Sequence, residues 1–331
     1  MWYQALRPAL FALDPERAHK LVLQALRTVG QRGLRVPVGV PVELMGLRFP
    51  NRVGLAAGFD KNGAAVDGLG SLGFGFIEVG TVTPRAQPGR ARPRLFRLPA
   101  EGALINRLGF PNDGAAEVAA RLRHRRYRGI VGVNIGKNAA TPVARAIDDY
   151  VACMRMVQQD ADYVTVNVSS PNTAGLRTLQ EREHLEPLLT ALLQERAKHS
   201  RSREHHLPLL VKIAPDLKAA EVRVIASLLV DLRLDGVIAT NTTVSRHGIS
   251  GAASNQAGGI SGLPLHPLAL HTIKGLRAAL GPAFPIIGAG GIDSPKAAIA
   301  MRDAGADLVQ IYTGLIYKGP SLISKCIRAL G

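Results

Sequence analysis

Polar side chains recur immediately after the short apolar runs of this sequence, and their types limit the chemistry that they could perform. Asp60 and Lys61 follow the first such run, and a second lysine, Lys212, lies near the end of the fifth. Ser170 stands in the polar segment after the fourth run, just before Pro171. Because Asp60 is the only acid that adjoins a run, paired-carboxylate hydrolysis and metal-dependent enolisation are poorly supported. The lysines favour an anionic ligand instead.

Amides are the second recurrent type, and each offers both a donor and an acceptor to a planar ligand such as a pyrimidine or an isoalloxazine edge. These amides are Asn106, Asn134, Asn167, Asn172 and Asn241. Gly290-Gly291 and Thr313-Gly314 follow the last two apolar runs, where a (β/α)₈ barrel usually binds phosphate. A phosphate site beside a planar heterocycle suggests a flavin mononucleotide, although a phosphate on the substrate would explain the glycines alone.

The elements that must position these residues are eight short apolar runs separated, for the most part, by amphipathic stretches. The runs span residues 53–57, 76–82, 130–135, 163–168, 209–213, 236–240, 285–289 and 308–312. Helical periodicity is clearest over residues 141–158, 181–198, 219–232 and 295–304. Continuous apolar runs are typical of buried parallel strands, and eight strand–helix units predict a (β/α)₈ TIM barrel of the α/β class rather than a doubly wound sheet. Such a barrel gathers its active site at the carboxyl ends of the strands.

The first 35 residues differ from the barrel pattern and predict a two-helix amphipathic extension. Asp14, Pro15 and Glu16 form a helix start, and the apolar residues after them recur at helical spacing. This hairpin (residues 1–35) could simply pack on the barrel (residues 36–331). Alternatively, it could rest on a membrane, with Arg17 and Lys20 facing lipid phosphates.

Charge and cysteine content exclude several classes of protein. The formal net charge is +16, but aromatic residues make up only 5% and no nucleic-acid module accompanies the charge, so we expect no nucleic-acid partner. Cys153 and Cys326 are too few for a disulfide framework and indicate a reducing compartment without a structural metal. No run reaches the ~20 apolar residues of a spanning helix, and no secretory signal is evident.

Nine stretches in order along the chain together resemble the dihydroorotate dehydrogenase family. They are LAAGFDK (55–61), GTVTP (80–84), INRLGF (105–110), NIGKN (134–138), NVSSPNTAGLR (167–177), VKIAPD (211–216), ATNTT (239–243), GGISG (258–262) and GAGGID (288–293). The resemblance extends from residue 14 to about residue 320. It implies FMN as cofactor, dihydroorotate as substrate, orotate as product, and a role in pyrimidine biosynthesis.

The resemblance also implies roles for individual residues. Ser170 would be the base that takes the C5 proton of dihydroorotate while C6 passes hydride to the flavin. The residues implied for the substrate are Lys61, Asn106, Arg107, Leu108, Gly109, Phe110, Asn167, Asn172, Asn241 and Thr242. Those implied for FMN are Ala57, Gly58, Phe59, Asp60, Lys61, Thr81, Asn134, Asn167, Lys212, Thr240, Gly262, Gly291, Tyr312 and Thr313.

A serine at position 170, rather than the cysteine of family members with soluble acceptors, indicates the class 2, quinone-dependent branch, and so does the N-terminal extension. His19, Arg97 and Tyr312 match the quinone site of that branch. The resemblance thus implies a membrane quinone (ubiquinone or menaquinone) as acceptor and a bilayer contact through the hairpin. We therefore expect a peripheral protein on the cytoplasmic face of the cell membrane, acting as a monomer.

Simpler explanations remain at single positions. Ser170 could be a turn hydroxyl, Lys212 a lysine whose stem lines the barrel, and His19 a structural residue on a helix face. Three other functions also remain: a soluble-acceptor member of the same family, a phosphate-binding barrel lyase or isomerase without flavin, and a basic binding module.

Overall fold

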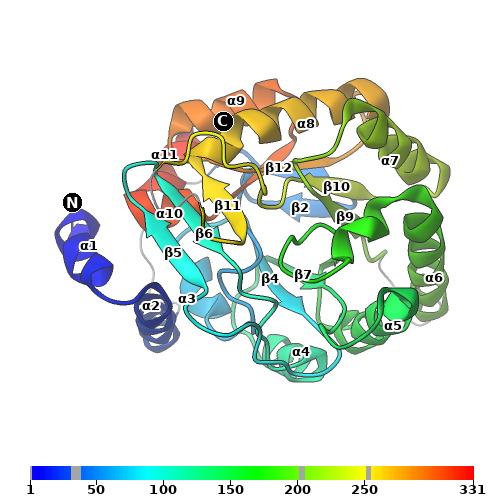
Figure 1. Cartoon of the computed structure of the whole chain (residues 1–331), viewed down its shortest axis with the longest axis horizontal. Coiled ribbons are helices and arrows are strands. Elements are labelled where there is room, and N and C mark those ends of the chain that lie inside the picture. The colour runs from blue at the N-terminus through cyan, green and yellow to red at the C-terminus, as the bar shows by residue number, and fades with distance from the viewer. Residues whose placement is uncertain (1, 31–38, 201–205, 251–254) are drawn as a thin grey trace.

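The computed structural model describes residues 2–30, 39–200, 206–250 and 255–331, and its centre is a closed barrel of eight parallel strands (Figure 1). Around the barrel the order is β3 (Val53–Leu55), β4 (Phe76–Val82), β7 (Ile130–Ile135), β8 (Tyr163–Asn167), β9 (Leu209–Ile213), β10 (Gly236–Ala239), β12 (Ile286–Ala289) and β13 (Leu308–Ile311). These strands confirm the eight predicted runs, and no bound differs by more than two residues. The predicted (β/α)₈ barrel is therefore confirmed.

Helices surround the barrel and shield its outer surface from water (Figure 1). They are α3 (Val66–Gly70), α4 (Ala115–Arg123), α5 (Ala146–Val157), α6 (Arg182–Ser200), α7 (Ala219–Asp231), α8 (His266–Leu280), α9 (Pro295–Asp303), α10 (Thr313–Lys318) and α11 (Ser321–Leu330). Short 3₁₀ turns precede or follow some of them at Val143–Arg145, Leu176–Gln180 and Leu263–Leu265.

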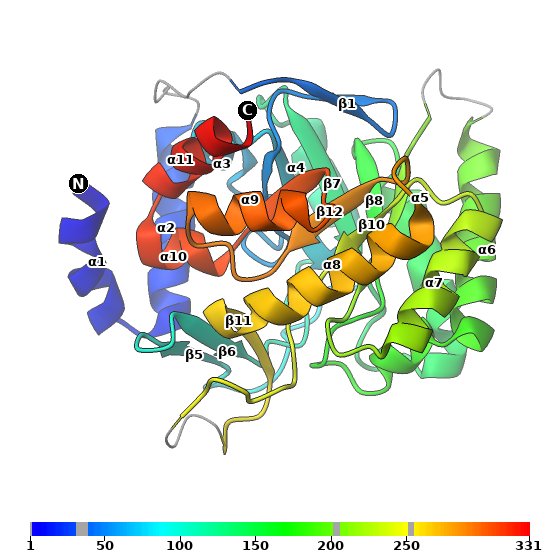
Figure 2. The same ribbon diagram turned by 90° about the horizontal axis from the view of Figure 1, so that it is seen from above.

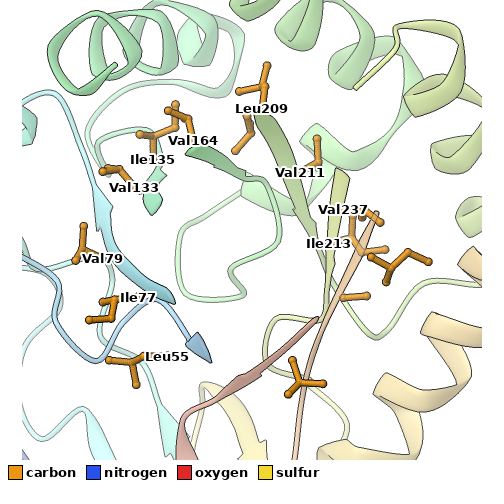
Figure 3. Packing of buried hydrophobic residues seen from close by; sticks show 14 of the residues in the cluster. Leu55, Ile77, Val79, Val133, Ile135, Val164, Leu209, Val211, Ile213 and Val237 are labelled. Atoms are coloured by element: carbon orange, nitrogen blue, oxygen red, sulfur yellow. The ribbon is translucent and has the colours of Figure 1, made fainter. Parts of the chain in front are cut away.

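The main hydrophobic core lies between the strands and these helices (Figure 3). Alternate strand residues such as Ile77, Val79 and Val133 point outward into it and are fully buried. The barrel interior is apolar only at the amino ends of the strands, where Phe76 and Tyr163 belong to a second cluster that Phe49 closes. Farther along the strands the inward positions become polar. The apolar end therefore provides stability, and the polar end is where a ligand can bind.

Two smaller sheets, which the apolar pattern did not predict, lie at opposite ends of the barrel (Figure 2). The hairpin of β1 (Val42–Leu44) and β2 (Leu47–Phe49) covers the amino ends of the barrel strands. An antiparallel sheet of β5 (Leu95–Leu98), β6 (Ala103–Asn106) and β11 (Gly259–Gly262) stands at the other end. This sheet brings residues about 150 positions apart in the sequence side by side, with Asn106 opposite Gly259.

The predicted N-terminal hairpin is confirmed as α1 (Trp2–Ala12) and α2 (Pro15–Val29). The Asp14 side chain accepts a hydrogen bond from the Arg17 backbone N–H at 3.0 Å and caps α2, as its sequence predicted. The two helices lie at the side of the barrel beside β5 and α10 (Figure 2). The predicted domain boundary between residues 35 and 36 falls outside the described residues. Among the described helices, none has the length and apolar character needed to cross a bilayer.

Candidate active site

A cavity opens at the carboxyl ends of the barrel strands, beneath the sheet of β5, β6 and β11, and it collects most of the predicted site residues. The predicted base Ser170 lines it, and so do the predicted substrate residues Lys61, Asn106, Leu108, Gly109, Phe110, Asn167, Asn172, Asn241 and Thr242. Among the predicted cofactor residues, it is also lined by Ala57, Gly58, Thr81, Lys212, Thr240, Gly262, Gly291, Tyr312 and Thr313. We call this space the first cavity.

Four predicted residues do not line the first cavity, and each has another structural role. Phe59 faces a second cavity and packs against His19 and Tyr312. The buried Asp60 carboxylate accepts hydrogen bonds from three backbone N–H groups of residues 62–65 and so shapes the turn after β3. Arg107 donates to the Pro93 carbonyl outside the cavity, and its guanidinium stacks on Phe96. Asn134 is fully buried behind Asn167, which lines the cavity and donates a hydrogen bond to it.

A ladder of asparagine amides connects the barrel interior with the first cavity. Asn167 donates to the side-chain oxygen of Asn134 at 3.1 Å, and Asn241 donates to the side-chain oxygen of Asn167 at 3.2 Å. In a separate pair at the same cavity, Asn172 donates to the side-chain oxygen of Asn106 at 2.9 Å. Because these amides hold one another, they present their remaining donors and acceptors in one orientation, as recognition of a planar heterocycle requires.

Ser170 is buried at the wall of the first cavity, in the loop after β8. Its hydroxyl oxygen accepts a 3.3 Å hydrogen bond from the Asn172 backbone N–H. In the same loop, the Thr173 hydroxyl oxygen is buried and has no hydrogen-bond partner among the described residues. The loop therefore carries three buried hydroxyl groups, those of Ser169, Ser170 and Thr173, and Ser170 is the one at the cavity wall.

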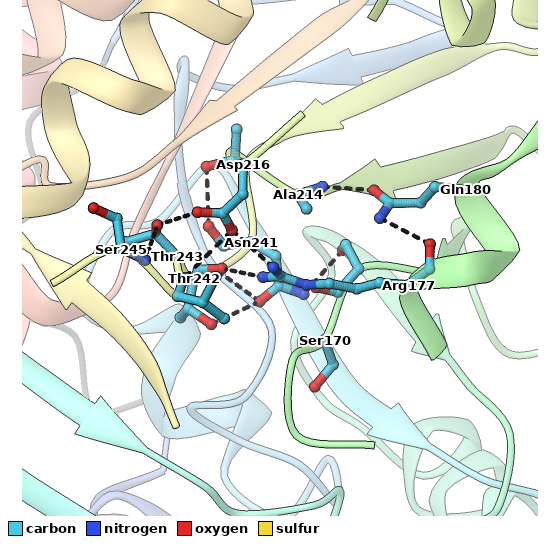
Figure 4. A network of polar contacts seen from close by, with 12 residues as sticks. Ser170, Arg177, Gln180, Ala214, Asp216, Asn241, Thr242, Thr243 and Ser245 are labelled. Atoms are coloured by element: carbon cyan, nitrogen blue, oxygen red, sulfur yellow. Dashed lines mark hydrogen bonds and ion pairs between the residues drawn. The ribbon is translucent and has the colours of Figure 1, made fainter. Parts of the chain in front are cut away.

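Arg177 ties the serine loop to two other loops at the same end of the barrel (Figure 4). Its guanidinium donates to the Ser169 carbonyl at 3.1 Å, to the Asp216 carboxylate at 2.8 Å and to the Thr242 carbonyl at 2.8 Å. Asp216 in turn accepts a hydrogen bond from the Thr243 hydroxyl. These contacts hold the loops after β8, β9 and β10 in one relative position.

Lys61 supplies positive charge to the first cavity. Its ammonium donates to the Gly58 carbonyl at 2.6 Å, which holds the side chain against the loop. Burial lowers the pKa of Lys61 to about 8, although the carboxylates of Glu16 and Asp60 oppose that shift. A carboxylate ligand would restore the favoured charged form, so Lys61 is suited to bind one.

Lys212 and Gln310 form the floor of the first cavity and are suited to a ligand with acceptors and donors on its ring edge. The Lys212 ammonium makes no hydrogen bond to any residue in the described ranges, and Gln310 Oε1 is buried without a partner there. Burial also lowers the pKa of Lys212. Gly291 also lines the cavity, and only glycine fits there, because its φ is +69° and a Cβ would lie 2.6 Å from His266 Cβ; the backbone at such a glycine is suited to a phosphate. These features fit FMN.

Some lining residues were not predicted from the sequence. They are Ala56, Ser261, Leu265, Ala289, Ile292 and Gln310, whereas Gly290 was expected from the Gly-Gly pair after the seventh run. Gln310 interrupts the apolar strand β13, and this interruption was a usable signal. Ser261 lies on β11, whose pairing with β6 had no local signature, and its hydroxyl accepts a 2.8 Å hydrogen bond from Thr313.

A second, largely apolar cavity lies between the hairpin and the barrel, and it contains all three residues predicted for the quinone. His19, Arg97 and Tyr312 line it together with Phe59, Leu10 and Val22, among others. Burial lowers the pKa of His19 to about 3, so this imidazole is neutral at physiological pH. Tyr312 lines both cavities, and its hydroxyl donates to the Gly58 carbonyl at 3.2 Å. Burial raises the pKa of Tyr312 to about 12, which keeps the phenol protonated.

Comparisons with known proteins agree with this geometry. The sequence profile described as dihydroorotate dehydrogenase matches residues 40–331. A Pseudomonas aeruginosa protein named dihydroorotate dehydrogenase (quinone) is 51% identical over 99% of this chain and 98% of its own. An Acinetobacter baylyi protein of the same name is 48% identical over the full length of both chains. The crystal structure of the Eimeria tenella enzyme in complex with ferulenol has a TM-score of 0.90 at 38% identity, covering 96% of this chain and 90% of that one.

Proposed function

Because the chain belongs to the dihydroorotate dehydrogenase family, we propose that its first cavity binds FMN and dihydroorotate together, with Ser170 as the catalytic base. The protein is a flavin-dependent enzyme of pyrimidine biosynthesis that oxidises dihydroorotate and passes the electrons to a quinone. The observation that carries the proposal is the convergence of Ser170, Lys61 and Lys212 on one cavity, although Ser170 follows β8, Lys61 follows β3 and Lys212 lies in β9.

Within the proposed site, the cofactor would occupy the part of the cavity lined by Lys212, Gln310 and Gly291. FMN, when bound, accepts the hydride that leaves C6 of dihydroorotate. The Lys212 ammonium would stabilise negative charge that develops on the ring, since it is preorganised and shielded from water. Tyr312, with its hydroxyl donating to the Gly58 carbonyl, would support the same region from the side of the second cavity.

The substrate would lie on the serine side of the cavity. Lys61 would bind the carboxylate of dihydroorotate, and the amides of Asn106, Asn172 and Asn241 would bind its ring. Ser170 Oγ would then take the proton from C5. A serine hydroxyl is a weak base at neutral pH, so the buried hydroxyl of Thr173 is a suitable next acceptor for the proton that Ser170 releases.

We propose the second cavity as the quinone site, which distinguishes this chain from members with soluble acceptors. Its apolar lining suits a quinone ring and tail, while Arg97 and the neutral His19 offer polar contacts at its edge. Deletion of residues 1–30 should spare flavin reduction by dihydroorotate but abolish most of the turnover with a long-chain quinone. Full quinone turnover in that variant would contradict the assignment.

We also propose that the hairpin rests on the cytoplasmic face of the cell membrane. Leu6, Leu13 and Leu21 are 39–52% exposed on the hairpin, and the neighbouring Arg17 and Lys20 are exposed as well. This combination of apolar and cationic side chains is typical of helices that lie in a bilayer interface. A monomer suffices for the proposal because one chain supplies the residues that line both cavities.

One experiment tests the cofactor and the base together. The purified enzyme should show a flavin absorption band that bleaches when dihydroorotate is added without oxygen, and the released cofactor should be FMN. Ser170→Ala should retain the flavin but bleach at least 100-fold more slowly, since general-base catalysis contributes about 10²–10⁴-fold. A colourless protein would contradict the cofactor assignment. An unchanged bleaching rate in Ser170→Ala would remove Ser170 from the mechanism.

A further inference from the structure

The side chain of Gln87 contacts two residues that line the first cavity without lining the cavity itself, and the mechanism proposed above does not use it. Gln87 stands in the segment between β4 and β5 and is half-buried. Its Nε2 donates hydrogen bonds to the carbonyls of Gly109 at 3.0 Å and Phe110 at 3.1 Å. Its Oε1 accepts from Asn138 Nδ2 and from the Ala139 backbone N–H, both at 2.9 Å. One side chain therefore joins the turn that contains Gly109 and Phe110 to the loop after β7.

Backbone groups fix the orientation of the Gln87 amide. A carbonyl can only accept a hydrogen bond and a backbone N–H can only donate one, so Nε2 must face Gly109 and Phe110. For the same reason Oε1 must face Ala139. If the amide were turned over, its oxygen would face two carbonyl oxygens and its nitrogen would face an N–H group. The contacts therefore require both the donors and the acceptor of the glutamine.

The turn that Gln87 holds has an unfavourable backbone conformation. Gly109 and Phe110 have φ angles of +70° and +54°, in the left-handed region that residues with a Cβ atom rarely adopt. For Phe110 this conformation is strained, and it persists only where the surrounding contacts hold it. The Phe110 carbonyl also accepts from Asn112 Nδ2 at 2.8 Å, whereas the Gly109 carbonyl accepts from Gln87 alone among the described residues. The Gly109 carbonyl thus depends on Gln87.

The carbonyl contacts of the turn also determine where its N–H groups point. The Leu108 carbonyl accepts from the Arg90 backbone N–H at 2.9 Å, and it shares a peptide unit with the N–H of Gly109. The Gly109 carbonyl, held by Gln87, shares a peptide unit with the N–H of Phe110. In a trans peptide unit the N–H points away from the C=O, so both N–H groups point away from the segment that contains Gln87 and Arg90. Neither donates to a described residue, so the turn keeps two backbone donors available at the cavity wall.

We propose that Gln87 is a positioning residue for substrate recognition: it holds the turn at residues 108–110 in the form that binds dihydroorotate. This inference rests on the proposed binding of dihydroorotate in the first cavity, which these three residues line. The surrounding chain does not depend on the Gln87 amide, because Gln87 and Asn112 pair through their backbones at 2.9 and 3.0 Å. Removal of the amide should therefore loosen the turn and leave the fold intact.

The test is the affinity of Gln87→Met for orotate and dihydroorotate. Methionine keeps the length of the side chain and removes its donors and its acceptor. Calorimetric titration of the flavin-loaded variant with orotate should give a Kd about tenfold higher than that of wild type. The reason is that the turn loses two hydrogen bonds, each of which contributes about two- to tenfold to an equilibrium constant. The Kd for dihydroorotate, measured from anaerobic flavin reduction at increasing substrate concentration, should rise by the same factor.

The limiting rate of flavin reduction separates a positioning role from a general disturbance of the fold. Gln87 contacts neither the loop of Ser170 nor a residue proposed to bind FMN. The limiting rate should therefore stay within about threefold of wild type, as expected when only binding is weakened, and the flavin content should not change. A loss of flavin and of the limiting rate together with the affinity would reduce Gln87 to a structural role and overturn the inference.

Gln87→Glu is the matched second variant. Glutamate keeps the shape of the side chain and the acceptor for Ala139 but, when charged, offers no donor to the two carbonyls. Its Kd for orotate should rise at least as far as that of Gln87→Met. Ala86→Glu controls for the added charge, because it places the same charge on the neighbouring exposed residue. Water and salt screen a charge at such a position, so Ala86→Glu should bind orotate within about twofold of wild type.

Wild-type affinity for orotate in Gln87→Met would overturn the inference. If Gln87→Met does not fold, Gln87→Glu decides, and an affinity equal to that of Ala86→Glu would overturn the inference in that case. A wild-type protein that contains no flavin and binds no orotate would overturn the proposed function instead, so the two failures are distinguishable.

Discussion

Arg97 provides the sharpest test of how the N-terminal hairpin is held on the barrel. The residue lies on β5, and its guanidinium donates to the backbone carbonyls of Leu10, Phe11 and Leu13 at 3.2, 3.1 and 2.8 Å. It also stacks on the Phe11 ring at 4.7 Å. The first two carbonyls lie in the last turn of α1 and the third lies one residue beyond it. Carbonyls at the end of a helix have no N–H donor within the helix, and they favour a positive charge. Arg97, on β5, therefore caps the carboxyl end of α1.

The magnitude follows from the three hydrogen bonds. A bond to a charged donor contributes about 1.5–3 kcal/mol when buried, but Arg97 is only half-buried, so we take about 1 kcal/mol for each. Arg97→Met keeps the apolar stem and removes about 3 kcal/mol, which shifts the docking equilibrium of α1 roughly 100-fold towards release. Arg7→Met is the matched comparison, because Arg7 donates a single 2.9 Å bond to the Tyr317 carbonyl and should cost about fivefold.

Hydrogen exchange of the α1 amides measures this equilibrium without any contribution from quinone binding. In Arg97→Met the α1 amides should exchange much faster than in Arg7→Met, while the barrel amides and flavin reduction by dihydroorotate stay unchanged. Arg97→Lys should fall between wild type and Arg97→Met, because an ammonium keeps the charge but lacks the planar array of donors. Unchanged α1 protection in Arg97→Met, or equal effects of the Arg97 and Arg7 variants, would refute the reasoning.

Two further predictions concern the first cavity. The pKa of Lys61 is about 8, so its ammonium is present below that pH and is lost above it. The value of kcat/KM for dihydroorotate should therefore fall as pH rises through about 8. Lys61→Arg should move this decline to higher pH. A pH profile without a break near 8 would exclude Lys61 as the carboxylate partner. Arg177→Met should slow flavin reduction at least tenfold with little loss of flavin, because the serine loop loses the three hydrogen bonds that Arg177 donates. Arg182→Met is the control, because it removes surface ion pairs only, and its flavin should be reduced at the wild-type rate. Equal rates in the two variants would show that Arg177 does not position Ser170.

The barrel was predictable because its strands are buried on both faces. The outward positions are apolar along the strands and the inward positions are apolar at their amino ends, so each strand is a largely apolar run whose carboxyl end the sequence marks with polar residues. The sheet of β5, β6 and β11 was not predictable in this way. Its strands have four residues each, and β11 pairs with a strand about 150 residues earlier, so no local pattern encodes the contact. That sheet nevertheless covers the site and contributes Asn106, Ser261 and Gly262 to it.

The site was predictable where polar residues stand at strand ends, and Lys212 was recognised inside β9, but two polar residues within other strands were missed. Ser170, Asn172 and Thr242 follow strands and were recognised. Gln310 and Glu78 lie inside β13 and β4, where a single polar residue among apolar neighbours looks like an exception rather than a site. Only the closed barrel shows that both point into the same interior and meet at 2.8 Å. The resemblance also assigned Phe59 to the cofactor, whereas its ring lines the second cavity.

The placement of Phe59 explains how two cavities of opposite character can be adjacent. Gly58 and Lys61 line the first cavity and Phe59 lines the second, so one short turn after β3 forms the wall between them. The Asp60 carboxylate holds this turn by accepting hydrogen bonds from its backbone N–H groups. The hydroxyl of Tyr312, the residue after β13, donates to the Gly58 carbonyl of the same turn. Because Phe59 faces one side of this turn and Gly58 and Lys61 face the other, a polar site for the substrate and an apolar site for the quinone are separated by a single segment of backbone. The hairpin completes only the apolar side, where His19 packs on Phe59 at 5.0 Å, and this is why its loss should affect the quinone and spare dihydroorotate.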